Sequence, residues 1–466
     1  MASVAVIGGG LAGLTAAYAL RRRGYAVTLH ESGAHTGGAV QTVREKGWVA
    51  DLGANSMLAP PPLVADIFRE LRLLDERVDA NAIARRRYIV RNGRPVPIPS
   101  SPGTFIRTPL FSPATKLRIL TEPLRRKSAA AGEESLAGLV RRRLGQEMVD
   151  YGLNPMVAGV YAGDPERLSA LHAMPSLGAL ESRYGSLIGG VIRMMKERRQ
   201  GNETPEGHLF SFRHGMGTIP QMLTVALGDT VQLQSVVTRI APVGASWLVT
   251  ARGAEGMVTA QYDAVIATAP AHALARIQFE GRGPAEWQQL GDLAYSPVSV
   301  VVSGFRREDV AHPLDGFGML VPAVERRNTL GTLFSSTLFS GRAPTGHVML
   351  TTFVGGARQP DLALTGDAEL TAAVDRDLHD LLGVRGPATF RAIGRHALGI
   401  PQYNCGYGRL EMAMDQLEQQ NPGLFLAGSF RNGVAVADVM TSGALAAQEA
   451  AAAVDPASLI AAEMAG

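Results

Sequence analysis

The sequence contains few of the residues that stabilise secreted or metal-binding proteins. It has one cysteine, Cys405, in 466 residues. An internal disulfide is therefore excluded, and the fold does not depend on an oxidising compartment. The sequence has no CxxC, no HExxH and no cluster of carboxylates, so we expect no metal site. Aromatic residues make up only 6% and no nucleic-acid recognition motif is present, so we expect no nucleic-acid partner.

Long apolar runs are also absent. The sequence has no run of eighteen or more apolar residues, which is about the length that a helix needs to cross a bilayer. An apolar run begins within five residues of the start, but a glycine loop interrupts it and Glu31 soon follows. A structural strand is therefore a better interpretation than a secretory leader, and we expect a cytoplasmic protein. The composition, 46% apolar and 19% charged, is typical of a soluble globular protein, and the length predicts two or three domains.

Positive charge is concentrated in one segment. The net charge is only +3, yet residues 85–143 contain fourteen Lys or Arg and three Glu. One interpretation is a set of solvated helical faces. The other two are an anionic substrate and the anionic surface at the inner face of a cell membrane.

A glycine loop follows the first predicted strand. Residues 3–7 (SVAVI) predict a buried parallel strand, and Gly8, Gly10 and Gly13 match G-x-G-x-x-G ahead of an amphipathic helix. A second predicted strand ends at Glu31, an acid that suits a ribose diol and repels the 2′-phosphate of NADP. The pattern predicts a dinucleotide site at the N-terminus of the helix.

Later glycine clusters favour FAD over NAD. Gly37-Gly38 and the segment around Gly53 follow the loop, and LAGSFRNGVAVADVMTSG lies near the end of the chain. These clusters predict close backbone passage along an extended ligand. A helix N-terminus at the last cluster would stabilise the negative charge of reduced flavin.

The order of predicted elements indicates an α/β protein with a discontinuous Rossmann-like FAD-binding domain. A mixed-sheet substrate domain and a helical domain that associates with a membrane interrupt it. The expected segments are FAD-binding at 1–58, 208–292 and 402–466, substrate at 59–84 and 293–401, and helical and basic at 85–207.

Several stretches resemble known families. The E-x5-GG loop, DLGANS, DAVIATAPA and LAGSFRNGVAVADVMTSG resemble the FAD-dependent amine oxidase superfamily. NPMVAGVYAGDPERLSALHAMPSL (154–177), TTFVGGARQP (351–360) and LGIPQYNCGYGRL (398–410) are similar to the protoporphyrinogen oxidase family. The resemblance implies FAD-dependent removal of six electrons from protoporphyrinogen in porphyrin and heme biosynthesis. It further implies oxygen as acceptor and a possible homodimer. One departure is Tyr407, because the family has a histidine after the glycine of the PQYNxG stretch.

The resemblance also implies site residues. The FAD contacts carried over are Gly8, Gly10, Ala12, Gly13, Glu31, Gly38, Gly53, Ala54, Asn55, Val237, Gly428, Val434 and Val436. No Cys or His is placed to link to the flavin, so binding is expected to be non-covalent.

On the substrate side, Arg87 anchors a propionate, Gly159 lets the backbone approach the macrocycle, and Leu320 and Phe334 sandwich the rings. Arg87 could also be a solvated arginine, and Leu320 and Phe334 ordinary core residues. No catalytic acid or base is expected, and His172 and His214 are interpreted as structural.

Alternatives remain open from the sequence. Coproporphyrinogen III could replace protoporphyrinogen IX as substrate, and an amine oxidase or a carotenoid desaturase could use the same scaffold. A non-enzymatic alternative is a binding protein similar to the GDP-dissociation inhibitors. Such proteins lack intact flavin contacts, whereas both glycine regions are intact here.

Overall fold

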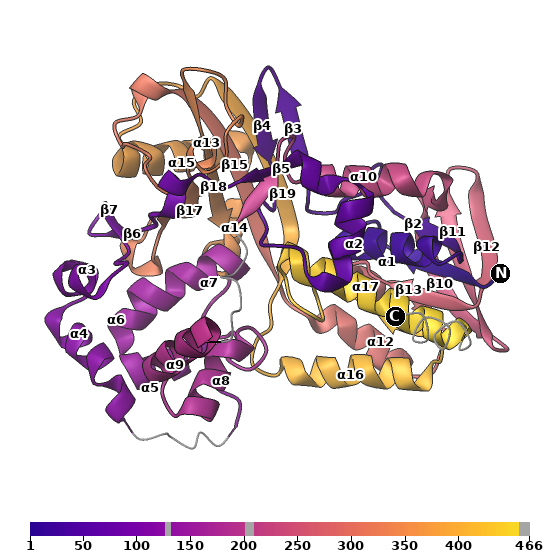
Figure 1. Cartoon of the computed structure of the whole chain (residues 1–466). Helices are drawn as coiled ribbons and strands as arrows, with labels where there is room; N and C mark the ends of the chain where they lie inside the picture. Colours follow the sequence, from indigo (N-terminus) through magenta and orange to yellow (C-terminus); the bar gives the residue numbers. More distant parts are fainter. Residues whose placement is uncertain (126–131, 201–208, 456–466) are drawn as a thin grey trace.

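The computed structural model describes residues 1–125, 132–200 and 209–455. Figure 1 shows three parts: a nucleotide-binding part around α1 and α17, a sheet part around β15 and β18, and a helical part around α5 and α7. Arg126 and Lys127 of the basic segment lie outside the described residues.

A parallel sheet forms the centre of the nucleotide-binding part. Its order is β20-β13-β1-β2-β9, and each neighbouring pair is parallel. The strands are β1 (Ser3–Ile7), β2 (Ala26–His30), β9 (Val231–Gln232), β13 (Ala264–Ala267) and β20 (Leu424–Leu426). Three distant stretches of sequence thus build one sheet, which confirms the predicted discontinuous α/β fold.

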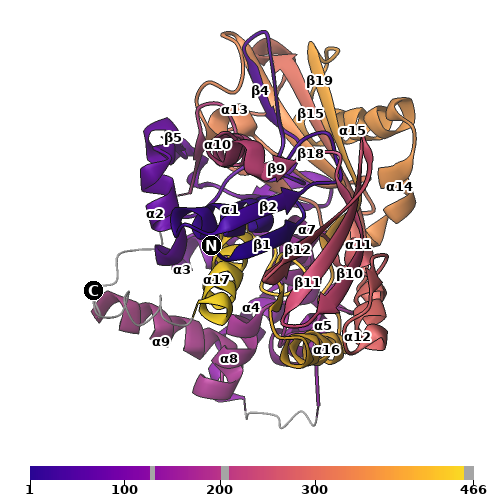
Figure 2. The same ribbon diagram turned by 90° about the vertical axis from the view of Figure 1, so that its right-hand side faces the viewer.

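Both faces of this sheet are covered. Val4 and Val6 of β1 pack into one core, and Ala5 and Ile7 into another, as expected for a parallel strand buried on both sides. Helices α1 (Leu11–Arg22), α10 (Thr218–Leu227) and α17 (Val436–Val454) cover the first face. The second face carries the sheet of β10 (Val236–Val243), β11 (Ser246–Gly253), β12 (Gly256–Tyr262) and β14 (Gln278–Phe279). Figure 2 shows this second sheet beside β1. Helices α12 (Pro284–Gln289) and α16 (Tyr407–Gln420) pack beside it.

The sheet part, which is expected from the sequence to bind the substrate and is called the substrate sheet below, has seven strands of order β19-β15-β18-β17-β16-β6-β7. Its strands are β6 (Tyr88–Arg91), β7 (Arg94–Pro97), β15 (Tyr295–Arg306), β16 (Gly318–Leu320), β17 (Thr329–Leu333), β18 (His347–Gly355) and β19 (Phe390–Pro401). Helix α15 (Asp367–Leu382) covers one face. The other face packs against the hairpin of β3 (Thr42–Glu45) and β4 (Trp48–Asp51), and against α7 (Asn154–Tyr161).

The hairpin β6–β7 differs from the expectation, because it lies within the segment 85–207 that was expected to be helical. Tyr88 and Ile89 pair in parallel with Met319 and Leu320 of β16. The physical reason is local: an aromatic and β-branched run precedes an Asn-Gly turn, which strongly favours a hairpin. Residues 88–97 therefore extend the substrate sheet.

The helical part surrounds a buried ion pair. Its helices are α3 (Pro102–Arg107), α4 (Pro113–Leu120), α5 (Leu136–Leu144), α6 (Gln146–Met148), α7, α8 (Pro175–Tyr184) and α9 (Leu187–Gln200). The Glu122 carboxylate pairs with Arg143 and accepts hydrogen bonds from the backbone N–H groups of Leu187 and Ile188, each at 3.0 Å. It therefore caps the N-terminus of α9. Within the described ranges, no helix combines the length and apolarity needed to span a bilayer.

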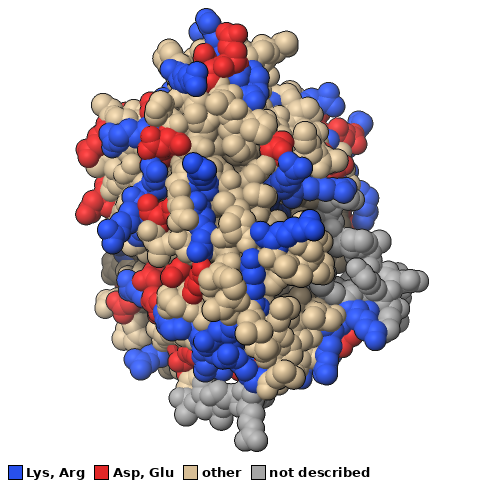
Figure 3. All heavy atoms as spheres, turned by 90° about the vertical axis from the view of Figure 1, so that its left-hand side faces the viewer, with Lys and Arg blue, Asp and Glu red and all other residues tan. Residues whose placement is uncertain are grey.

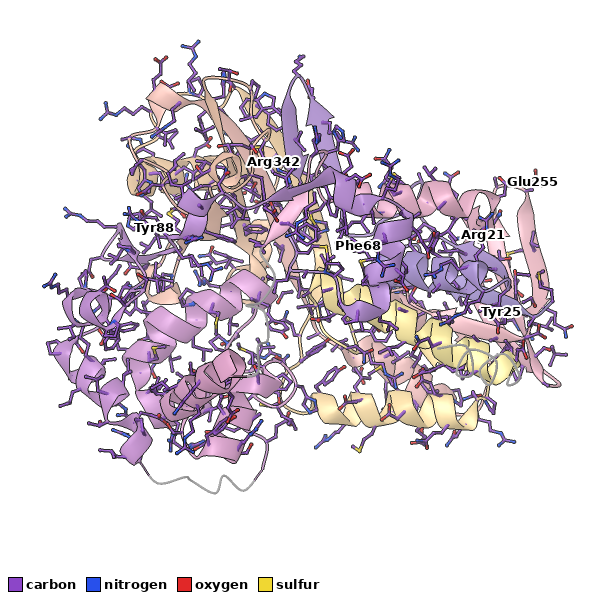
Figure 4. All side chains as sticks on the ribbon, in the orientation of Figure 1. Arg21, Tyr25, Phe68, Tyr88, Glu255 and Arg342 are labelled. Atoms are coloured by element: carbon purple, nitrogen blue, oxygen red, sulfur yellow. The ribbon has the colours of Figure 1, made fainter. Side chains whose placement is uncertain are left out.

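A second buried ion pair joins the nucleotide-binding part to the substrate sheet. The Arg342 guanidinium lies 3.2 Å from the Asp51 carboxylate, and both side chains are 3% exposed. Figure 4 shows Arg342 where the substrate sheet meets the β3–β4 hairpin. Asp51 also accepts hydrogen bonds from the Thr42 hydroxyl and the Met216 backbone N–H, so its carboxylate connects three segments. Burial raises the pKa of Asp51 against the opposing effect of Arg342.

Candidate active site

The glycine loop leaves space beside the first turn of α1. A Cβ on Gly13 would lie 1.9 Å from the Gly8 carbonyl oxygen, and Gly8 itself has a φ of +109°. These two glycines are required by the packing of the loop. Gly10 is different, because a Cβ there would meet nothing within 4 Å, and no side chain caps the helix that starts after it. The N–H groups of the first turn are therefore available to an anionic ligand, and Ala12 is buried just inside this turn.

Glu31 is fixed at the edge of the loop. One carboxylate oxygen accepts a hydrogen bond from the Gly9 N–H at 2.7 Å, and the other from the Gly33 N–H at 2.6 Å. The Ser235 N–H donates to the Glu31 carbonyl at 2.8 Å. This contact brings the start of β10, with Val237 at a bulge in the strand pairing, beside the acid predicted to bind a ribose.

The second glycine cluster packs directly on the first. The Gly37 N–H donates to the Gly9 carbonyl at 2.8 Å, and a Cβ on Gly38 would lie 3.5 Å from the Cα of Gly10. At Gly53 a Cβ would lie 1.9 Å from the Ala39 carbonyl oxygen. The Asn55 amide donates to the Gly53 carbonyl at 2.8 Å, and Ala54 lies between these two residues.

The third cluster leads into α17. The Gly428 N–H donates to the Ser442 hydroxyl at 2.9 Å, and no side chain caps α17 before Val436. A Cβ on Gly443 would lie 2.1 Å from the Ala12 carbonyl oxygen, so α17 crosses α1 close to the glycine loop. Val434 is partly exposed in the segment between Gly428 and the helix. The structure therefore brings all three predicted glycine clusters together.

An apolar surface lies on the α7 side of the substrate sheet. Leu320, Leu333 and Phe353 share this face. Leu320 and Phe353 both pair with Gly331 on the strand between them. Leu333 lies two residues after Gly331, so its side chain is on the same face of the sheet. All three are partly exposed. A Cβ on Gly159 of α7 would lie 3.1 Å from Leu320 Cδ2, so the two predicted substrate residues are in contact.

Helix α7 contributes further exposed apolar side chains. Met156 is 38% exposed and Val160 is 51% exposed, one turn apart and beside Gly159. The Arg358 guanidinium holds the start of this helix, donating to the Asn154 side-chain oxygen at 3.2 Å and to the Val321 carbonyl at 2.9 Å. Burial lowers the pKa of Arg358 to about 10.

Phe334 is placed differently from the expectation. It is fully buried in the core under α15, and its ring lies 5.4 Å from His312 and 6.3 Å from Tyr88. The cause is strand alternation: Phe334 shares its core with Met319, whose side chain lies on the opposite face from Leu320. Its position matches the alternative interpretation, a core residue, whereas Phe353 presents an aromatic ring on the face of Leu320.

Arg87 lies directly before β6 and has an exposed side chain. Its guanidinium carbon is 5.1 Å from the Phe317 ring centroid. The neighbouring Arg86 pairs with Asp315, which also accepts a hydrogen bond from the Tyr88 hydroxyl. Figure 4 shows Tyr88 between the substrate sheet and the helical part. Arg87 pairs with no carboxylate in the part of the chain that the structure describes, so its guanidinium can receive one from a ligand.

Comparison with known proteins decides the family. The protein-family model described as flavin containing amine oxidoreductase matches residues 11–451 of this chain. The chain belongs to this family. A mitochondrial protoporphyrinogen oxidase from Nicotiana tabacum is 37% identical over 472 residues, which cover 95% of this chain and 94% of that protein. The coproporphyrinogen III oxidase of Staphylococcus aureus is 25% identical over 465 residues, which cover 96% of this chain and 98% of that protein. A crystal structure from Exiguobacterium sp. 255-15 has a TM-score of 0.80 at 24% identity, covering 96% of this chain and 98% of that chain.

These findings confirm the predicted relationship and identify the chain as a flavin oxidoreductase. A flavin cofactor fits the site on three observations: the open space at Gly10, the N-terminus of α1 without a side-chain cap, and the third cluster beside it. No cluster of metal ligands exists among residues 1–125, 132–200 and 209–455.

Sequence reasoning missed Leu333, Phe353, Met156 and Val160. The first two follow from strand parity once Leu320 is assigned to the substrate face, because side chains alternate along a strand. Met156 and Val160 follow from helical spacing around Gly159. The sequence marked Tyr407 only as a departure from the family pattern. In the structure its hydroxyl donates to the Phe430 carbonyl at 2.7 Å, in the loop that leads to α17.

Proposed function

We propose that this protein binds FAD non-covalently and oxidises protoporphyrinogen IX to protoporphyrin IX, with three O₂ reduced to three H₂O₂. The observation that carries the proposal is the apolar face formed by Leu320, Leu333 and Phe353 opposite α7. A flat, apolar tetrapyrrole would lie against this face, beside the point where Leu320 contacts Gly159 of α7. The relatives named protoporphyrinogen oxidase, at up to 37% identity over most of the chain, support the same substrate.

Different residues would bind different parts of the cofactor. Gly8, Gly10, Gly13 and Glu31 would hold the pyrophosphate and the ribose of the dinucleotide. The first turn of α17 would stabilise negative charge on the flavin. When bound, the flavin supplies the two-electron acceptor for each of the three oxidation steps.

The protein's part in the chemistry is orientation and exclusion of water. The apolar side chains of α7 and of the sheet keep water from the rings, and Arg87 can pair with a propionate through both of its terminal nitrogens. No side chain of the substrate surface named above is an acid or a base. The reaction on this surface therefore depends on positioning the donor carbon against the flavin.

The test uses the purified holoprotein and two substrates. We expect a yellow protein that releases its flavin on acid precipitation, and porphyrin fluorescence that appears with protoporphyrinogen IX under air. Comparing kcat/KM for protoporphyrinogen IX and coproporphyrinogen III decides the substrate, because the second carries four carboxylates and Arg87 offers one pairing site. A higher kcat/KM for coproporphyrinogen III would overturn the assignment, as would turnover of an amine or phytoene but of neither porphyrinogen.

We further propose that the helical part docks on an anionic membrane surface. Ile106, Leu117, Leu120 and Leu124 of α3, α4 and the turn after it are 64–85% exposed. Arg118 and Arg125 line a hollow of about 510 Å³ beside Leu117. Figure 3 shows Lys and Arg side chains on this side of the molecule, interspersed with uncharged surface and with some Asp and Glu side chains. Exposed apolar side chains flanked by cations are typical of peripheral membrane contacts.

Flotation with vesicles of phosphatidylcholine and phosphatidylglycerol tests this contact. We expect binding at low salt, weaker binding at high salt, and loss of binding in Leu117→Ser/Leu124→Ser. Met257→Ser/Val258→Ser is the matched control, because both residues are exposed on β12. Protein that stays at the bottom of the gradient at low salt would refute the proposal.

A further inference from the structure

The segment 402–407, which connects β19 to α16, contacts the other parts of the molecule. It contains the QYN stretch, to which neither the fold nor the substrate surface assigns a role. The Ser169 N–H donates to the Tyr403 carbonyl, and the Cys405 N–H donates to the Arg167 carbonyl, both at 2.8 Å. These contacts attach the segment to the helical part.

Two tyrosine hydroxyls of this segment hold the loop 428–433. The Tyr403 hydroxyl accepts a hydrogen bond from the Gly433 N–H at 2.9 Å and donates to the Ser429 carbonyl. The Tyr407 hydroxyl donates to the Phe430 carbonyl at 2.7 Å. Both side chains are buried, at 3% and 6% exposure. Burial raises the pKa of both hydroxyls, so they stay protonated and keep donating throughout the physiological range.

Ser442 of α17 and the side chain of Arg431 also connect the loop 428–433 to the neighbouring helices. The Ser442 hydroxyl accepts from the Gly428 N–H and donates to the Asn432 side-chain oxygen at 2.8 Å. The Arg431 side chain pairs with Asp415 and Glu418 of α16, at 2.7 and 2.6 Å. The loop continues into the first turn of α17, which no side chain caps. The position of that turn therefore depends on what holds the loop.

We propose that Tyr403 and Tyr407 are positioning residues for the flavin, because their hydroxyls fix the loop that presents the first turn of α17 to the cofactor. This inference rests on the proposed function, which places the flavin at that turn. The effect of the hydroxyls can be tested without removing the rings. The two rings pack against each other at an interplanar angle of 36°, with centroids 4.5 Å apart, and phenylalanine would keep that packing.

The experiment compares Tyr403→Phe and Tyr407→Phe with Tyr161→Phe as the matched control. The Tyr161 side chain is similarly buried, and its hydroxyl donates to the Ala173 carbonyl at 2.7 Å rather than to a group of the loop 428–433. Apoproteins are titrated with FAD by flavin fluorescence, and the reduction potential of the bound flavin is measured against dyes. Ser442→Ala removes a contact on the other side of the same loop, which provides a second variant if either tyrosine variant folds poorly.

We expect the Kd for FAD to rise about 3- to 10-fold in Tyr407→Phe, the effect of losing its hydrogen bond to the Phe430 carbonyl. The rise should be at least as large in Tyr403→Phe and Ser442→Ala, because each of these side chains makes two hydrogen bonds with the loop. The affinity for reduced flavin should fall about 2- to 5-fold more than that for oxidised flavin, because the helix terminus favours the negative charge. Tyr161→Phe should change neither quantity.

Wild-type affinity and potential in all three loop variants would overturn the inference while leaving the proposed function intact. An equal loss in Tyr161→Phe would overturn it too, since the effect would then be general destabilisation. A wild-type protein that binds no FAD would overturn the proposed function itself.

Discussion

Replacing Arg87 by alanine tests the placement of the substrate most directly. Arg87 is exposed directly before β6 and lies over the Phe317 ring, and it pairs with no carboxylate of the described residues. Its removal therefore breaks no ion pair among these described residues. The substitution lies far from all three glycine clusters in the sequence, so we expect the flavin content of Arg87→Ala to equal that of the wild type.

The expected loss follows from one charge-assisted contact. A hydrogen bond between a guanidinium and a propionate contributes roughly 1.5–3 kcal/mol, which corresponds to a decrease in kcat/KM of about 10- to 150-fold. Because the propionate is held equally in the ground state and the transition state, most of the loss should be a rise in KM. Arg87→Lys should recover part of it, since an ammonium keeps the charge but not the paired geometry.

The assay is the initial rate of porphyrin fluorescence with protoporphyrinogen IX, for Arg87→Ala, Arg87→Lys and Arg85→Ala. Arg85 is the matched control because it is an exposed arginine two residues away. We expect Arg85→Ala to lower kcat/KM by less than about twofold, as is usual for a solvated charge. An unchanged kcat/KM in Arg87→Ala, or an equal loss in Arg85→Ala, would show that the segment acts only through its total charge.

Three further substitutions test other parts of the structure. Gly10→Val should weaken FAD binding at least about tenfold but leave the melting temperature of the apoprotein unchanged, because a side chain there enters open space; a lowered apoprotein melting temperature would contradict this. Burial lowers the pKa of His30 to about 4, so the unfolded state binds the extra proton below about pH 6.5 and the free energy of unfolding should fall by up to about 3 kcal/mol as the pH approaches 4. Urea titrations at pH 7.5 and 5.0 should show a smaller decrease in His30→Gln, and an identical decrease would refute the assignment. Arg342→Met leaves the Asp51 carboxylate buried without a cation and should cost about 3–5 kcal/mol, or roughly 3–5 °C in melting temperature for a chain of this length; Asp51→Asn in the same protein should recover much of the loss, and failure to do so would show that packing of Arg342 matters more than its charge.

The glycine loop shows why part of the site could be predicted from the sequence. Gly8, Gly13 and Glu31 act within one βαβ unit, so their spacing along the chain fixes their geometry. Phe334 shows the limit of this reasoning. Which aromatic ring faces the substrate depends on the pairing of β16, β17 and β18, and a shift of one residue moves a side chain to the other face of the sheet.

Long-range packing also explains the other differences between the sequence-based predictions and the structure. The hairpin 88–97 joins the substrate sheet because β16, more than two hundred residues later, provides a partner strand. Likewise, the role of Tyr407 depends on a carbonyl group 23 residues further along the chain. Neither partner could be identified from local pattern alone.

The order of strands in the parallel sheet has a consequence for synthesis of the protein. β1 is the central strand and is made first, yet β13 pairs on one side with β20 at Leu424–Leu426. The apolar side of α1 is covered by α17, which begins at Val436. The glycine loop therefore cannot acquire its final surroundings until α17 has left the ribosome, more than four hundred residues after the loop itself. During that interval the apolar side of α1 and the edge of β13 stay open to other chains. A truncated product is therefore expected to aggregate. The full chain is expected to need chaperones while its distant strands pair slowly.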